Sequence, residues 1–260
     1  MKTLVTKVLK SKGLTLILPI VVIGCAAPAA YNSNTGEVAY RPASGSLIQQ
    51  GESAFAQYKK KTPISRNSDA RARVFRVASR LSPVISLPGA NWEFEVFEDS
   101  SANAFALPGG KVGVNTGLLD IANTDGQLAA VLAHEMAHVT SNHAAARVQN
   151  NQTIALGVAI LGAVLGGSES GQQIGQLATK GGEIAFGLTF SRSQELEADR
   201  VGTIFMAQAG YDPADAITLW QRMGAANRSS TPEFLSTHPV SSTRIQKLQE
   251  FLPVARAQQR

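Results

Sequence analysis

The chain has 260 residues, a hydrophobic fraction of 44% and a formal net charge of +5, which suits one sizeable globular domain or two small ones. Four of its 24 basic residues lie in the first 24 positions, which contain no acid, so that 20 basic residues face 19 acidic ones in the rest of the chain. Because those 20 form no basic stripe with interleaved aromatic residues, composition gives no support for nucleic-acid binding.

The first 24 residues are typical of an export signal. A basic start is followed by LTLILPIVVIG, which at about eleven residues is too short to span a bilayer. It ends in Val-Ile-Gly before Cys25, the only cysteine of the chain, and this resembles a bacterial lipoprotein signal. We expect residues 1–24 to be removed and a lipid on Cys25 to anchor the chain in the bacterial cell envelope, facing the periplasm. Ala26 favours the outer membrane. The alternative is an uncleaved anchor or a plain secretory signal.

Residues 25–45 are rich in Ala, Pro, Ser, Asn and Gly, which predicts a flexible tether. We expect residues 46–260 to form a single domain. Apolar residues recur with helical spacing over residues 46–60 and 69–81, whereas NWEFEVFE alternates as a strand does. The stretch NAFALPGGKVGVN then predicts a hairpin that turns at Pro-Gly-Gly.

A long helix is expected from a cap at Asn123 or Thr124 to near Val148, and Asp125 suits the positive end of its dipole. Residues 153–187 follow and contain nine glycines. They predict either an ordinary core helix or a weakly ordered flap that gates the site. Further helices are expected over residues 191–209, 213–226 and 240–252. The fold class predicted is α+β, mainly helical, with a small antiparallel sheet or hairpin beside the active-site helix.

The stretch LAAVLAHEMAHVTSNH contains three of the four histidines of the chain. His134 and His138 are one helical turn apart on the same face, so both imidazoles can bind one metal ion. Glu135 lies about 100° round the helix, where it can act as a general base on water. The alternative is a buried helix face with two hydrogen-bonded histidines. The apolar residues that precede the motif favour a metal site, because buried polar groups need partners.

A catalytic zinc site also needs a third protein ligand and an open position. The pattern HExxHxxGxxH is excluded here, since Ser141 and Ala144 occupy its glycine and third-histidine positions and His143 is one residue out of register.

A glutamate from a second helix is the remaining source of the third ligand. The stretch SRSQELEADRVG offers Glu195, and Asp199 shares its helical face while Glu197 points about 200° away. Asp199 can accept a hydrogen bond from the second ring nitrogen of a ligand histidine. Ala198 and Gly202 are small, which would let this helix approach the first closely.

An HExxH motif followed some fifty-seven residues later by ExxAD resembles the gluzincin family of zinc metallopeptidases that contains HtpX and the CAAX prenyl endopeptidase. NAFALPGG, FSRSQELEADRVG and STHPVSSTRI resemble further conserved elements of that family, so the resemblance covers roughly residues 90 to 250. It is strongest to the short periplasmic lipoprotein members and to the Oma-type mitochondrial proteases. The lipoprotein members carry additional cysteines that this chain lacks, so regulation by a disulfide is not expected.

The resemblance implies a zinc metalloendopeptidase that binds one Zn²⁺ per chain through three ligands, His134, His138 and Glu195. Zinc would acidify water and polarise the scissile carbonyl, and Glu135 would take up the proton and deliver it to the leaving amine. By resemblance, His238 would donate to the oxyanion, and Arg244 would support His238 or act as a second donor. The alternative for both is an ordinary helix start.

The strand around Asn103, Ala104 and Phe105 is the candidate substrate-binding edge, where an extended peptide can pair with the backbone and little sequence is demanded; the alternative is a plain hairpin. This mode suits a protease of unfolded or misassembled envelope proteins. A second reading is a periplasmic chaperone or assembly factor with a little-used zinc site, and a weaker one is a hydrolase of non-peptide amides such as peptidoglycan cross-links. The oligomeric state stays open.

Overall fold

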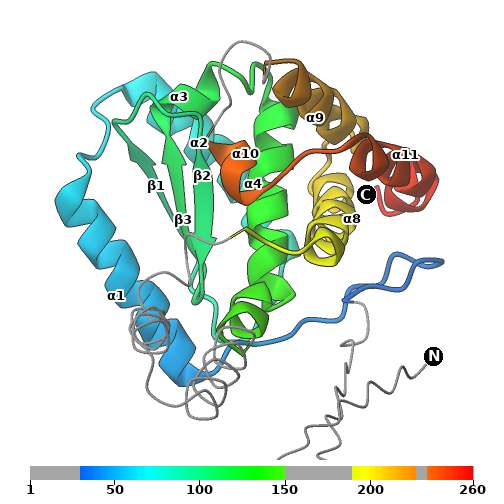
Figure 1. The fold of residues 1–260 in the computed structure, drawn as a ribbon, viewed down its shortest axis with the longest axis horizontal. Helices are drawn as coiled ribbons and strands as arrows, with labels where there is room; N and C mark the ends of the chain where they lie inside the picture. Colours follow the sequence, from blue (N-terminus) through cyan, green and yellow to red (C-terminus); the bar gives the residue numbers. More distant parts are fainter. Residues whose placement is uncertain (1–29, 150–188, 227–232, 260) are drawn as a thin grey trace, which may run out of the picture.

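The computed structural model describes residues 30–149, 189–226 and 233–259, and it has the mainly helical α+β fold predicted from the sequence (Figure 1). The elements in chain order are α1 (Gly45–Lys61), α2 (Ser68–Leu81), η1 (Ser82–Val84), β1 (Glu93–Phe97), β2 (Ala104–Leu107), β3 (Lys111–Asn115), α3 (Thr116–Leu119), α4 (Asp125–Thr140), α8 (Arg192–Gln208), α9 (Ala214–Ala226), α10 (Phe234–Thr237) and α11 (Ser242–Arg256).

Two expectations concern parts of the chain outside the described residues. These are the signal sequence with Cys25 and the glycine-rich segment 153–187. Within the described residues, none of the helices combines the length and the hydropathy that a membrane span requires.

The three strands form one sheet in the order β1-β3-β2. The predicted hairpin is present: β2 and β3 pair antiparallel, and Gly109 and Gly110 turn the chain at φ values of 86° and 84°, which glycine adopts without a steric penalty. β1 instead pairs parallel with β3, so the sheet is mixed rather than antiparallel as expected. β2 is left at the edge.

Different helices cover the two faces of the sheet, because successive side chains of a strand point to opposite faces. Val96 and Val114 belong to the main core with α2 and α4, whereas Phe97 and Phe105 pack with Phe55 of α1. The ring of Phe105 lies directly over Gly113, where an added Cβ would be 2.3 Å from the ring.

Helix α4 runs through the centre of the molecule, and its residues are buried from Gly126 to Thr140. Its cap is Thr124, whose hydroxyl accepts a hydrogen bond of 3.1 Å from the backbone N–H of Gln127. The helix ends well before Val148, because Asn142 adopts a left-handed conformation with φ 52°. Residues 143 to 149 are helical again after this break.

Helix α8 packs against α4 along the face that carries the two motif histidines (Figure 1). A capping box of Ser191 and Gln194 starts α8. At Gly202 an added Cβ would lie 3.0 Å from the backbone nitrogen of His134. The small residue therefore brings the two helices close enough for their side chains to share one site.

The segment expected to be a flexible tether is held in place in its described part, residues 30–44, which we call the N-terminal strap. The backbone N–H of Arg41 donates to the carbonyl of Thr140 at 2.8 Å, and Tyr31 packs edge-on against Phe251 at 5.4 Å. Ala30 is fully buried. The low apolar content of the strap suggested flexibility, but backbone hydrogen bonds and the aromatic contacts of Tyr31 and Tyr40 anchor it.

Candidate metal centre

Helices α4 and α8 bring the three expected metal ligands together in the buried interior. The Nε2 atoms of His134 and His138 lie 3.1 Å apart. The Oε2 atom of Glu195 lies 3.5 Å from Nε2 of His134, and its Oε1 atom lies 3.4 Å from Nε2 of His138. One helical turn separates the two histidines, and the close α4–α8 contact supplies the carboxylate from the other side.

These separations fit a zinc ion. Ligand atoms about 2.05 Å from a tetrahedral zinc lie about 3.3 Å from one another. The two imidazole nitrogens are 3.1 Å apart, and each has one oxygen of Glu195 within 3.5 Å. Two imidazole nitrogens and one carboxylate are also a ligand set that zinc uses in hydrolytic enzymes. The residues present therefore match the metal that the sequence predicted.

His238 lies inside the same cluster. Its Nδ1 atom is 3.2 Å from Nε2 of His134 and 2.9 Å from Oε1 of Glu195, and it offers a fourth donor atom for a metal. Its Nε2 atom is 3.3 Å from Oε1 of Glu135. The ring stacks on Phe234 with a centroid distance of 4.4 Å. The sequence placed His238 near the reacting groups, and the structure puts it in direct contact with both the ligands and the expected base.

Glu135 is buried beside His134, and its carboxylate faces the same space as the ligands. Burial raises the pKa of Glu135 above its usual range, and the neighbouring His238 and His134 act in the opposite direction. A hydrogen bond from the backbone of Ala106, on the edge strand β2, also favours the charged form. A carboxylate with a raised pKa is suited to accept and return a proton near neutral pH.

His134 and His138 have different surroundings, which shift their pKa values in opposite directions. Burial lowers the pKa of His138 well below its usual range, which favours the neutral imidazole that a metal binds. Burial acts in the same direction on His134, but Asp199 and then Glu195 outweigh it and raise the pKa of His134 to about 9. Asp199 lies 3.1 Å from Nδ1 of His134, the place expected for it. A metal must therefore displace a proton from His134.

Arg244 lies elsewhere than expected. It was expected to support His238 or to face the substrate, but its guanidinium forms two hydrogen bonds with Asp199, at 2.8 and 2.7 Å. Its Nη1 atom also lies 2.6 Å from Oε2 of Glu195. This arginine therefore holds the two α8 carboxylates in place, because a planar guanidinium can bind a carboxylate through two parallel bonds.

The expected substrate strand is an edge strand, as peptide pairing requires. Of its three residues, however, Phe105 points into the aromatic cluster under α1, Ala104 is buried, and Asn103 donates to Glu233 at 3.3 Å. The residue of β2 that reaches the centre is Ala106, one position beyond the predicted set. In an antiparallel pair, alternate residues direct their backbone groups away from the partner strand. The backbone of Ala106 therefore faces the same way as that of Ala104, and this was the available signal.

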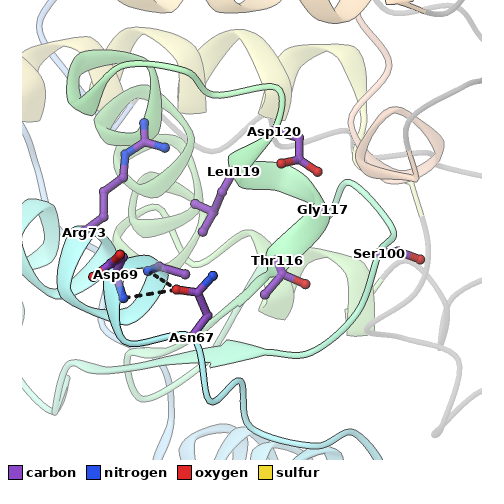
Figure 2. A pocket seen from close by; sticks show the side chains of 9 residues that line it. Asn67, Asp69, Arg73, Ser100, Thr116, Gly117, Leu119 and Asp120 are labelled. Carbon is purple, nitrogen blue, oxygen red and sulfur yellow. Dashed lines mark hydrogen bonds between the residues drawn. The ribbon is translucent and has the colours of Figure 1, made fainter.

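Of two hollows in the described surface, one borders this centre and the other lies away from it. A small one beside His138 is lined also by Ala106, Val139 and Phe190. A larger one of about 420 Å³ lies at the start of α2, away from the histidines (Figure 2). There the side chain of Asn67 accepts two hydrogen bonds from the first turn of α2, and Arg73 is bound to Asp125 and Ala122. Asn67 and Arg73 of the larger hollow thus serve the fold.

Phe190 also belongs to the centre, although the sequence did not single it out. Its ring lies 3.7 Å from the ring of His138 and 3.7 Å below the guanidinium of Arg147. The signal was its position one residue before the serine that caps the ligand-bearing helix α8.

Residues 66–252 match the model of peptidase family M48. The chain is 41% identical over 184 residues to the mitochondrial metalloendopeptidase OMA1 of Schizosaccharomyces pombe, which covers 70% of this chain and 53% of that protein. It is 37% identical over 177 residues to OMA1 of Saccharomyces cerevisiae, covering 65% and 49%. It is 29% identical over 208 residues to the beta-barrel assembly-enhancing protease of Escherichia coli K12, covering 77% and 42%. The chain thus spans about half the length of these curated relatives.

Proposed function

Because the chain belongs to peptidase family M48, we propose that it is a zinc-dependent endopeptidase of the bacterial cell envelope that cleaves unfolded or misassembled polypeptides. The family membership supports a metallopeptidase, and the relatives with matching sequence are named as metalloendopeptidases or as a protease. The envelope location and the substrate class are our proposals for this chain.

One observation carries the catalytic part of the proposal: Glu135 adjoins three zinc-type ligands in a buried site. Zinc, when bound, acidifies water and polarises a carbonyl oxygen. Glu135 is positioned to hold the proton that water gives up and to pass it to the leaving amine. Arg244 and Asp199 keep Glu195 and His134 oriented, and β2, at the edge of the sheet, is the strand with which an extended peptide would pair.

The lipoprotein pattern before Cys25 supports the envelope location. We propose that a lipid on Cys25 anchors the chain, with its catalytic domain facing the periplasm and the outer membrane as the site of attachment. Such an anchor would place the protease where unassembled outer-membrane polypeptides are exposed. Labelled fatty acid should enter the wild-type chain and be absent from Cys25→Ser; equal labelling of both would contradict this part.

The alternative function is a chaperone or assembly factor with a structural zinc. The position of His238 favours this alternative, because four protein donors close a zinc site whereas catalytic sites keep one position open. The buried Glu135 favours hydrolysis instead, since a structural site does not need a base.

Cleavage of a permanently unfolded, labelled polypeptide by the full chain, purified in detergent, separates the two functions. We expect about one zinc per chain, cleavage that a chelator abolishes and zinc restores, and loss of bound zinc in His138→Ala. Bound zinc without any cleavage would favour the chaperone. The absence of bound zinc would overturn the proposed function.

A further inference from the structure

His143 is buried and Glu197 is half-buried. The catalytic proposal gives neither residue a role. On a continuous helix His143 would lie about 140° away from His138. The left-handed turn at Asn142 breaks the helix and brings His143 back against His138, with ring centroids 4.8 Å apart. All four histidines of the chain thereby belong to one connected cluster.

A chain of two hydrogen bonds leads outward from the metal ligand. Nδ1 of His138 lies 2.9 Å from Nδ1 of His143, and Nε2 of His143 lies 2.9 Å from Oε2 of Glu197. One arrangement of protons gives each of these nitrogens, and the carboxylate oxygen, a suitable partner. His138 binds metal through Nε2 and donates from Nδ1; His143 accepts at Nδ1 and donates from Nε2; the carboxylate of Glu197 accepts.

The outer end of this chain is fixed by the N-terminal strap. Nη2 of Arg41 lies 3.3 Å from Oε1 of Glu197, and the backbone N–H of Ala30 donates to the same oxygen. Arg41 is itself held by its backbone bond to Thr140 at the end of α4. Nη1 of Arg41 also donates to Oε2 of Glu197 at 3.5 Å. The strap therefore binds both oxygens of Glu197, and Oε2 contacts His143 as well.

We propose that His143 and Glu197 are positioning residues that fix the tautomer and ring orientation of the metal ligand His138. They do for His138 what Asp199 does for His134, which its carboxylate contacts directly. The strap completes the arrangement by holding Glu197. Metal-binding histidines commonly use the second ring nitrogen in this way, and loss of such a partner costs about 10- to 100-fold in metal affinity. This inference rests on the proposed zinc site.

The test compares zinc affinity, measured by competition with a chelator, among variants of the full chain in detergent. His143→Leu fills the buried position with an apolar side chain but leaves Nδ1 of His138 without an acceptor, so zinc should bind 10- to 100-fold more weakly. His143→Asn places a carbonyl oxygen near the position of Nδ1 and should recover most of the affinity. Glu197→Ala should weaken zinc binding by less, because His143 remains.

Thr203→Val is the matched control. Thr203 is fully buried on the same helix as Glu197, and its hydroxyl bonds only to its own helix, at Arg200, so the change should affect folding stability without affecting zinc affinity. If His143→Leu is too unstable to purify, Glu197→Ala and Arg41→Ala carry the test. Wild-type zinc affinity in folded His143→Leu, or in both other variants, would overturn the inference. A wild-type chain that binds no zinc would instead overturn the proposed function.

Discussion

Between α1 and the sheet the molecule buries aromatic rings, whereas between α4 and α8 it buries charged and polar side chains. The first region contains Phe55, Phe97, Phe105 and Tyr58, whose rings meet mostly edge to face at 4.7 to 6.3 Å. The second contains four histidines and the carboxylates that contact them. Both regions are well packed, and both lie within one small fold.

The two regions differ in how their parts depend on one another. Burial of aromatic surface is largely non-directional, so the loss of one ring costs stability in proportion to the area and cavity involved. Buried polar groups need particular partners, and removal of one leaves others unsatisfied in a low dielectric. We therefore expect substitutions under α1 to change stability alone, and substitutions between α4 and α8 to change metal binding and chemistry.

The largest effect is expected for Glu135→Gln. The amide keeps the shape of the side chain but cannot accept the proton, so the rate of peptide cleavage should fall by about 10²- to 10⁴-fold. Zinc content should stay at the wild-type value, because Glu135 is not among the three ligands. Single-turnover cleavage of an unfolded polypeptide and metal analysis measure the two quantities. Wild-type cleavage in this variant would show that the base has been misassigned.

Phe97→Ala should lower the stability of the fold and leave zinc binding unchanged. Phe97 is fully buried and contacts the rings of Phe55 and Tyr58, so its truncation should lower the free energy of unfolding by about 3 to 5 kcal/mol. Zinc affinity at a temperature where the variant is folded should be unchanged. Denaturant unfolding and chelator competition test this pair of outcomes. A variant that loses zinc affinity while still folded would mean that the two regions are coupled.

Local patterns predicted most of the secondary structure because each pattern reflects a local cause. The helical spacing of α2, the cap at Thr124 and the turn at Gly109 and Gly110 all depend on neighbouring residues. The parallel pairing of β1 with β3 and the anchoring of the strap at Thr140 depend on contacts between distant segments, for which the sequence gives no local signal.

The same distinction applies to the metal centre. The spacing of His134 and His138 on one helix predicted their proximity, and the two motifs together predicted Glu195. The position of His143 could not be foreseen, because it depends on the left-handed conformation of Asn142. Nor could the contact of Arg244 with Asp199 rather than with His238, since helix α11 meets α8 only in the folded chain.

Gly202→Ala probes the spacing on which the polar region depends. The added Cβ would lie 3.0 Å from the backbone nitrogen of His134, so α8 must move away from α4 by a few tenths of an ångström. We expect a destabilisation of about 1 to 3 kcal/mol together with weaker zinc binding. Gly45→Ala is the control, because an added Cβ there meets no atom within 4 Å. If Gly202→Ala binds zinc as tightly as the wild type, the centre tolerates more movement than its geometry implies.

The smallest effect is expected at the rim of the aromatic region, where Lys59 of α1 lies 2.7 Å from Glu93 of β1. The hydrogen bond from Lys59 is the main cause that lowers the pKa of Glu93 below 4.5. A carboxyl whose folded pKa is depressed stabilises the fold above its unfolded pKa and loses that contribution as the pH falls through the folded pKa. Because both side chains are a third or more exposed, the gain is about 0.2 to 1 kcal/mol.

Lys59→Met removes the ammonium, which also lies 4.8 Å from the centroid of the Phe55 ring, and Lys60→Met is a neighbouring control on the same helix. At pH 7 we expect Lys59→Met to be less stable than the control by about 0.2 to 1 kcal/mol, measured by urea unfolding. The deficit should shrink as the pH is lowered below 4.5, because the carboxyl then becomes neutral and no longer pairs with Lys59. Zinc affinity should be equal in the two variants at every pH. A deficit that persists at low pH would assign the effect to the contact of Lys59 with the Phe55 ring. A difference in zinc affinity would show that even this rim is coupled to the polar region.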